Sequence, residues 1–196
     1  MLGALALVRS WSGDFNHYWG GARTLLDGGD PYFALYRYPE AVQYLNEQYH
    51  PLPWVGLFFV PFALLPFQIA LHLWTALNII VLVLGLRAVF QLGRGTLAQW
   101  QLALIGLAIV WLSARCIYSQ QTTLIITTAL LYGLLSVQRG QWFKGGIWFS
   151  AILFKPWIAA GAVLALLLIV LARRRWRFLA GLTLAALSIV IATSIL

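Results

Sequence analysis

The sequence predicts an all-α fold, a polytopic bundle of transmembrane helices, and three observations support this prediction. Hydrophobic residues make up 62% of the 196 residues and charged residues only 9%, whereas soluble domains carry roughly 25% charged residues. Several apolar runs approach the roughly 20 residues that cross a bilayer core. These runs are continuous rather than alternating, which excludes a membrane β-barrel. Helices satisfy every backbone N–H and C=O group within the segment, as a lipid environment demands.

The positive charge is distributed as in a membrane protein rather than a nucleic-acid-binding protein. The formal net charge is +8, and many Lys and Arg residues occupy short gaps between apolar runs, at 87–96, 139–144 and 173–177. No acidic residue accompanies them, so the positive-inside rule predicts that these gaps are cytoplasmic. We therefore predict a multi-pass plasma-membrane protein that contacts membrane lipids and has no nucleic-acid partner.

The apolar runs define where the transmembrane helices are expected. The predicted spans are 68–86, 97–112, 123–137, 145–154 together with 157–172, and 178–196. Lys155 and Pro156 interrupt the fourth of these, and because proline cannot continue a helix the pattern predicts a broken helical hairpin. With the basic gaps inside, the turn at 113–121 is predicted to lie outside, and Lys155 lies at the outer apex of the hairpin.

Residues 50–66 are apolar but short. Prolines bound and interrupt the run, whose apolar part is only about 13–15 residues against the roughly 20 of a span. We predict an interfacial or re-entrant helix that begins and ends outside the cell. A full span over 52–66 is the alternative, but it would place Arg87 and Arg94 outside.

All five acidic residues fall in one polar segment, which we predict to be the extracytoplasmic loop. They are Asp14, Asp27, Asp30, Glu40 and Glu47. We treat 1–196 as a single membrane-embedded domain, in which 9–50 form this loop and 51–196 form the transmembrane and re-entrant helices. The anionic groups are thus expected on one face of the membrane.

A helix over 15–26 is expected inside the loop. Asp14 is a suitable N-cap, and Gly28 to Pro31 end the helix because glycine favours the C-cap and proline cannot continue. One face of this helix would carry Phe15, Tyr18, Ala22 and Leu25. The surrounding aromatic residues, including Trp19, suit the headgroup level of a membrane, where an aromatic belt without further purpose is the alternative.

Both ends of the chain suggest a piece of a longer protein. Residues 1–8 are apolar but too short to span, and they resemble the end of a first transmembrane helix more than a signal peptide, because no basic segment precedes them. The chain stops inside the apolar run 178–196. We therefore expect a fragment or a truncated gene product.

Several motifs resemble glycosyltransferase family 87. The stretch DFNHYWGGARTLLDGGDPY at 14–32 is similar to the family's loop pattern D-F-x-x-Y-x-x-A-x-x-L-L-x-G-G-D-P-Y. Five further segments resemble other motifs of the family: YHPLPWVGLFFVPFALLP, LHLWTALNIIVLVLGL, SQQTT, GGIWFSAILFKPW and RRRWR. The chain departs from the family pattern at His50, Ser119 and Thr122, which replace a proline, a glycine and an asparagine, and at Pro156, which follows the lysine directly.

The resemblance implies an integral-membrane glycosyltransferase of the GT-C type, of which this chain is the N-terminal half. Such enzymes take a sugar, typically mannose, from a polyprenyl-phosphate donor and transfer it to a lipid or glycan acceptor on the extracytoplasmic face. In members with an assigned role, the carboxylate after the first span is the catalytic base, and Asp14 matches it. No nucleotide donor and no cofactor are implied.

Acid–base and electrostatic chemistry support this division of roles. A positioned carboxylate can remove the proton of the attacking hydroxyl, and the leaving phosphate needs a cation to stabilise its charge. One base opposite the leaving group predicts inversion. The expected phosphate-binding residues are Lys155, Arg115 and His50. The expected substrate-binding residues are Asp30, Tyr18 and Gln120.

Each of these residues has a structural alternative. Asp14 could serve only as a helix cap, Asp30 only as a turn residue, and Arg115 could extend to the interface. His50 could simply lie at the interface. Lys155 is harder to explain without a function, because a charge at membrane depth costs several kcal/mol unless it is paired or functional.

No metal site is expected. His17, His50 and His72 have no ligand spacing, and the single cysteine, Cys116, excludes a disulfide framework and a cysteine-based zinc site. Asp27 and Asp30 could share an ion with Asp14, but the sequence does not favour this. Two other functions stay open: a transporter or flippase for lipid-linked sugars, with polar residues lining several spans, and a non-catalytic fragment or membrane scaffold.

Overall fold

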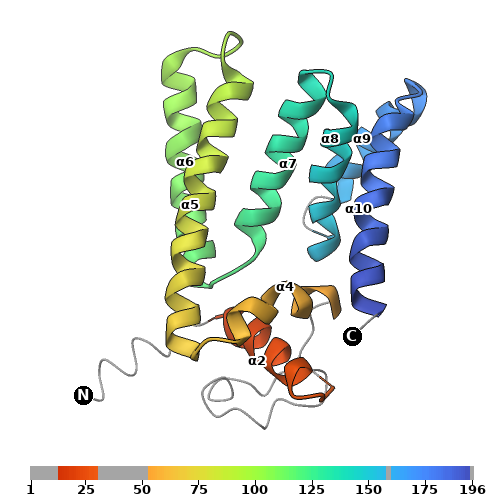
Figure 1. Ribbon diagram of the computed structural model, residues 1–196. Helices are drawn as coiled ribbons and strands as arrows, with labels where there is room; N and C mark the ends of the chain where they lie inside the picture. The colour runs from red at the N-terminus through yellow and green to blue at the C-terminus, as the bar shows by residue number, and fades with distance from the viewer. Residues whose placement is uncertain (1–12, 31–52, 158–159, 195–196) are drawn as a thin grey trace. The chain divides into compact units, whose positions relative to one another are not determined.

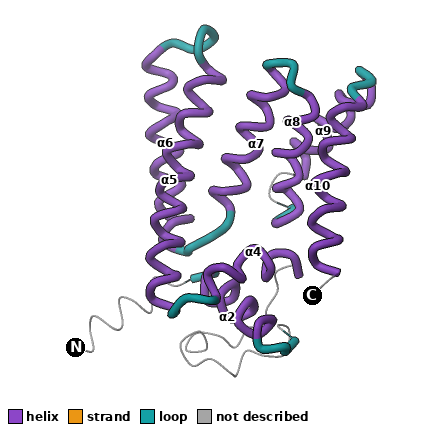
Figure 2. Tube along the Cα trace, viewed as in Figure 1, coloured by secondary structure: helices purple, strands orange, loops and turns teal. Residues whose placement is uncertain are grey.

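The computed structural model describes residues 13–30, 53–157 and 160–194 (Figure 1). Within these ranges the chain forms eight α-helices and one 3-10 helix and no strand, as Figure 2 shows. Three of these helices are long and apolar enough to cross a membrane: α5 (Phe67–Gly93), α6 (Gln99–Tyr118) and α10 (Trp176–Ser194). The prediction of an all-α fold with transmembrane helices is confirmed.

The described residues divide into two compact units. Among these residues, unit 1 comprises 13–30, 53–79 and 114–121, and unit 2 comprises 80–113, 122–157 and 160–194. Helices α5 and α6 therefore each contribute one part to unit 1 and another part to unit 2.

Unit 1 has an aromatic core. Helix α2 (Phe15–Leu26) packs against α4 (Pro53–Ala63), and Phe15 is fully buried. The ring centroid of Phe15 lies 5.8–6.4 Å from the rings of Phe59, Phe62, Phe67 and Trp74. Since large rings contribute most of the burial in such clusters, this core joins α2, α4 and the first turns of α5.

The bounds of α2 agree with the sequence. The predicted face is buried at Phe15, Tyr18 and Ala22. Trp19, which we expected among the headgroup-level aromatics, is also buried, and its Nε1 donates a hydrogen bond to the Leu65 carbonyl oxygen at 3.2 Å. The helix ends in a Schellman motif, in which Gly28 adopts a φ of 69° and the N–H of Gly29 donates to the Thr24 carbonyl.

Helix α4 is as short as the sequence indicated. Its 11 residues rise about 16 Å, roughly half of a hydrocarbon core of about 30 Å. Arg23 of α2 donates from Nη1 to the carbonyl oxygen of Ala63 at 3.2 Å and so satisfies one of the carbonyl groups that a helix end leaves without partners. The length agrees with an interfacial or re-entrant helix, which stays a prediction.

Unit 2 contains α7 (Thr123–Gln138), α8 (Trp142–Phe149) and α9 (Ala160–Ala172) in addition to α10. Helix α8 packs against both α7 and α10. The buried core consists of Phe149, Val170 and Phe178. These residues come from α8, α9 and α10, so the core joins three helices.

Glycines allow α8 and α10 to approach closely. A Cβ atom added at Gly146 would overlap the carbonyl oxygen of Phe178, and one added at Gly181 would overlap that of Phe143. In lipid, helix association depends on such close packing of small residues, because the apolar solvent supplies no hydrophobic driving force.

The predicted break at Lys155 is confirmed. Helix α8 is followed by a 3-10 helix, η1 (Ser150–Phe154), and Lys155 then leaves the helix with φ −149° and ψ 80°. This is the extended conformation that a following proline favours, because its ring would clash with a helical residue before it.

Two predicted helix ends are wrong. Residues 68–86 were expected to stop before Arg87, but α5 continues to Gly93, and 97–112 continues as α6 to Tyr118. Arginine is a good helix former, so a basic residue indicates where a helix leaves the apolar layer and not where its backbone ends.

We predict that Gly146→Ala destabilises the protein while Gly161→Ala does not. The added methyl group at Gly146 would force α8 and α10 apart, for which overpacking costs of about 1–3 kcal/mol are typical. Gly161 is a helical glycine of α9 with no atom within 4 Å of an added Cβ, so alanine there should be neutral or stabilising by up to about 1 kcal/mol. Thermal unfolding in detergent measures the stability of both variants. Equal changes in melting temperature would contradict the close contact between α8 and α10.

Candidate functional site

Asp14 stands at the N-cap position of α2, as predicted, but it does not cap the helix. Its φ of −61° and ψ of −21° are helical, and its side chain makes no capping hydrogen bond. A capping residue normally has extended backbone angles. Instead, Tyr18 one turn later donates its hydroxyl hydrogen to Asp14 Oδ2 at 3.3 Å. The half-buried carboxylate is therefore oriented by a side chain rather than by a capping hydrogen bond to the first helical turn.

The backbone of Asp14 is fixed against the turn that follows α6. Its N–H donates to the Ser119 carbonyl oxygen at 3.0 Å. Gly13 makes this approach possible, because it adopts a φ of 33° and an added Cβ would overlap the Ser119 carbonyl. This contact brings together two segments that are distant in sequence, both within unit 1.

The turn itself contains a residue in an unusual conformation. Gln120 has a φ of 53°, in the left-handed region that costs a non-glycine residue roughly 1–2 kcal/mol. The N–H of Gln121 donates to the Cys116 carbonyl at 3.0 Å, so the turn is the Schellman end of α6 with glutamine where glycine is usual. Such strain persists only where the surroundings impose it.

The surroundings of Gln120 explain why it is held there. Its side chain is fully buried. Its carbonyl oxygen accepts a hydrogen bond from Trp74 Nε1 at 3.1 Å, and its Oε1 accepts one from Thr75 Oγ1 at 3.2 Å. Its Nε2 is buried without a hydrogen-bond partner among the described residues, although a buried amide donor normally has one.

Tyr18 connects Asp14 with the aromatic core. It is buried and stacks on Phe59 with a centroid distance of 4.6 Å. Phe59 in turn lies 4.7 Å from the Trp74 ring, the same residue that binds the Gln120 carbonyl. Unit 1 thus connects Asp14, Tyr18 and Gln120 through packed rings and hydrogen bonds.

The other predicted site residues differ in their positions. Arg115 is exposed in the last turn of α6, where a cation also interacts favourably with the helix dipole. Asp30 is exposed just after the end of α2. Lys155 is half-buried and belongs to unit 2, and His50 lies outside the described residues. Unit 1 therefore contains five of the seven predicted residues, and the contacts described above connect three of them, Asp14, Tyr18 and Gln120.

Three residues of this site were not predicted from the sequence: Gly13, Trp74 and Thr75. Thr75 and the fully buried Asn78 are polar residues in an apolar helix, and intramembrane polar residues are by themselves a reason to suspect a function. No feature of the sequence indicates a role for Gly13. Its role depends on the close approach of its backbone to Ser119, which only the structure shows.

Within 13–30, 53–157 and 160–194, no group of three or more His, Cys, Asp or Glu side chains gathers in a way that could hold a metal ion. The side chains that the structure connects in this part of the site are one carboxylate, a phenol and an amide, with aromatic rings beside them.

Comparison with known proteins identifies the family. The model of glycosyltransferase family 87 matches residues 51–196. The chain belongs to glycosyltransferase family 87. No curated protein and no solved structure matches it. Family 87 membership, together with three helices that could cross a membrane, indicates a membrane glycosyltransferase that uses a sugar donor and an acceptor.

The matched range of this family 87 glycosyltransferase includes the turn around Gln120 as well as Lys155, and it begins after the 14–32 motif. Asp14 is therefore connected to the family region through its structural contact with Ser119.

We predict that Gly13→Ala disrupts the contact between Asp14 and Ser119. Alanine there combines left-handed strain of roughly 1–2 kcal/mol with an overlap against the Ser119 backbone. Hydrogen exchange followed by mass spectrometry should show faster exchange of peptides that contain the Asp14 amide.

Gly28→Ala is the matched control for this variant. Gly28 also has a positive φ, of 69°, but no atom lies within 4 Å of an added Cβ. It should therefore suffer the conformational strain alone and keep the Asp14 amide protected. Equal loss of protection in both variants would show that the overlap at Ser119 has no consequence.

Proposed function

We propose that this protein transfers a hexose, with mannose as the first candidate, from a polyprenyl-phosphate donor to a lipid or glycan acceptor. In this proposal the site faces the extracytoplasmic side of the plasma membrane, Asp14 is the general base and the reaction inverts the anomeric centre. Membership in family 87 supports a glycosyltransferase in general, and the residues of unit 1 support the finer assignment.

The observation that carries the proposal is the environment of Asp14. It is the first carboxylate of the chain, half-buried beside an aromatic core, and its backbone is fixed by the Ser119 carbonyl. Its Oδ2 accepts one hydrogen bond from Tyr18, and a carboxylate can accept several. A carboxylate fixed in this way is suited to take the proton of an incoming hydroxyl group.

The proposed step is a single displacement. The acceptor oxygen forms a bond to the anomeric carbon while its proton passes to the Asp14 carboxylate. The bond between the anomeric carbon and the phosphate oxygen breaks, and its electron pair leaves with the polyprenyl phosphate. Attack from the face opposite the leaving group gives inversion.

The charge on the leaving phosphate requires a cation. Lys155 and Arg115 are proposed for this role, and His50 as a further phosphate contact, because a positioned positive charge stabilises the negative charge that develops in the transition state. Asp30 and Tyr18 are proposed to contact the substrate. The apolar residues of α4 are suited to the prenyl chain.

Gln120 is proposed to bind a hydroxyl of the transferred sugar. Its buried Nε2, which has no partner among the described residues, is a donor that a sugar oxygen would satisfy. Leaving such a donor without a partner costs about 1–3 kcal/mol, so a substrate that provides one gains affinity.

We predict that Asp14→Asn reduces transfer from polyprenyl-phosphate mannose by at least about 100-fold, the lower range of general-base catalysis. Radiolabelled donor in proteoliposomes measures the rate, and thermal unfolding shows whether the variant folds. Asparagine keeps the size and the acceptor oxygen for Tyr18 but cannot take the proton.

Asp27→Asn is the control for this change. Asp27 lies at the other end of α2 in an exposed pair with Arg23 at 3.8 Å, so the same substitution should leave transfer nearly unchanged, since exposed pairs contribute little. Undiminished turnover in Asp14→Asn would remove Asp14 from its role. Movement of the lipid-linked sugar across the bilayer without transfer to an acceptor would instead favour a flippase.

We predict that Gln120→Leu raises the KM for the donor by about tenfold, which corresponds to about 1.4 kcal/mol, because the amide donor is lost. Thr75→Val removes the hydrogen bond to Gln120 Oε1 from the other side but leaves Nε2 in place, and it should change KM much less. A KM that rises equally in both variants would assign Gln120 a structural role only.

A further inference from the structure

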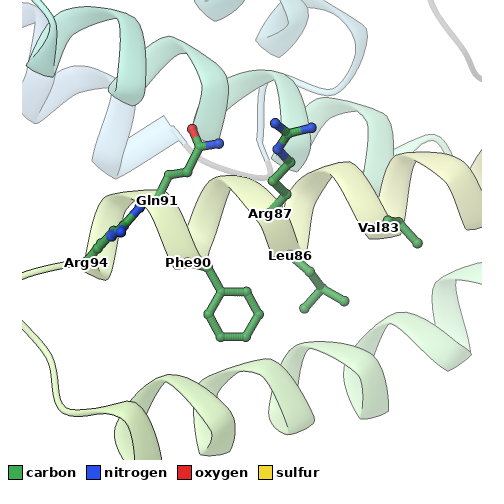
Figure 3. Close-up of a pocket in the computed structure, with 6 residues that line it drawn as sticks. All are labelled: Val83, Leu86, Arg87, Phe90, Gln91 and Arg94. Atoms are coloured by element: carbon green, nitrogen blue, oxygen red, sulfur yellow. The ribbon is translucent and has the colours of Figure 1, made fainter.

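A second polar site lies in unit 2, on the half of α5 that follows the aromatic core. A cavity of about 420 Å³ is lined by Val83, Leu86, Arg87, Phe90, Gln91 and Arg94. Figure 3 shows that Arg87 and Gln91 extend to one side of α5, whereas Leu86 and Phe90 extend to the other. The cavity therefore has a cationic part and an apolar part on the same helix.

Within unit 2, the cationic part has no acidic side chain to neutralise it. All five acidic residues of the chain lie between positions 14 and 47, so unit 2 carries no Asp or Glu from residue 80 onward. Arg87 and Arg94 are both exposed. Arg87 lies within α5, and Arg94 follows the last residue of this helix, Gly93; both side chains line the cavity.

A third guanidinium group binds a residue that lines the cavity. Arg139, the residue after α7, donates from Nη2 to Gln91 Oε1 at 2.9 Å. Gln91 lies between Arg87 and Arg94 in sequence, and this hydrogen bond holds its side chain in place. Two arginines therefore line the polar part of the cavity, and a third binds the glutamine between them. This arrangement suits a phosphate group because guanidinium groups bind its oxygens in pairs.

The apolar part is exposed at the protein surface. Val83 is 60% exposed and Phe90 43% exposed. The Phe90 ring packs over Gly106 of α6, where an added Cβ would lie 3.4 Å from Phe90 Cζ. In a span that leaves the apolar layer near Arg87, exposed side chains before the arginine contact acyl chains and those after it reach the headgroups.

We propose that this cavity binds an anionic glycerophospholipid, with its phosphate against Arg87 and Arg94 and an acyl chain along Val83 and Leu86. Basic pockets beside transmembrane helices on the cytoplasmic side suit such headgroups. The site is separate from the residues of the proposed transfer reaction, and the inference does not depend on that reaction.

A lipid fits the cavity better than free phosphate, because the apolar residues Val83, Leu86 and Phe90 would have no partner in a small inorganic anion. The charge also selects among lipids. A zwitterionic headgroup carries its own cation, which would lie close to three arginines without any acid in unit 2 to offset it.

Thermal unfolding of the purified full chain in detergent, with added phosphatidylglycerol, phosphatidylcholine or inorganic phosphate, tests the proposal. We expect phosphatidylglycerol alone to raise the melting temperature, since a ligand that binds only the folded state stabilises it. Native mass spectrometry should show retained phosphatidylglycerol in the wild-type protein. In the double variant Arg87→Gln, Arg94→Gln its affinity should fall by about tenfold or more.

Two further variants control for charge and for folding. Arg173→Gln, Arg177→Gln removes the same charge from another exposed basic segment of unit 2 and should retain the lipid. Arg87→Lys, Arg94→Lys keeps the charge but loses the paired N–H groups of the guanidinium, so its affinity should lie between that of the wild-type protein and that of the glutamine variant. Equal stabilisation by phosphatidylcholine, equal stabilisation by inorganic phosphate, or equal loss in the Arg173 and Arg177 variant would each overturn the proposal.

Discussion

The hydrogen bond from the Asp14 N–H to the Ser119 carbonyl oxygen, at 3.0 Å, is the constraint on which unit 1 depends. It fixes the start of α2 against the end of α6, and it requires a glycine at position 13 because no Cβ fits there. The aromatic core then continues from Phe15 through Phe59 to Trp74, whose Nε1 holds the Gln120 carbonyl. The carboxylate and the strained glutamine are thus held by one connected set of contacts.

The two units use different means of packing. Unit 1 is held by large rings and by side chains that donate to helix-end carbonyls, as Arg23 and Trp19 do at the end of α4. Unit 2 brings α8 and α10 together through Gly146 and Gly181. Large rings suit a segment at an interface with water, whereas small residues suit helices whose only solvent is lipid.

Charge is separated along the chain in the same way. The acids lie in its first quarter, and the residues from 80 onward carry cations without any carboxylate. A family 87 glycosyltransferase with this distribution can offer a base in one part of the molecule and phosphate-binding arginines in another. The proposed transfer reaction uses the first, and the proposed lipid site uses the second.

The sequence by itself determined the helical class, the family, the short α4, the bounds of α2 and the break at Lys155, because hydropathy, proline and glycine act locally on the backbone. The sequence predicted ends of α5 and α6 that are too early. Arg87 and Arg115 indicate where each helix leaves the apolar layer, but the helical backbone continues beyond them. Only the tertiary structure decided that Asp14 does not cap its helix, that Gly13 is required and that Gln120 is buried under strain. Each of these depends on contacts between segments far apart in the chain, and no local pattern of residues specifies such contacts.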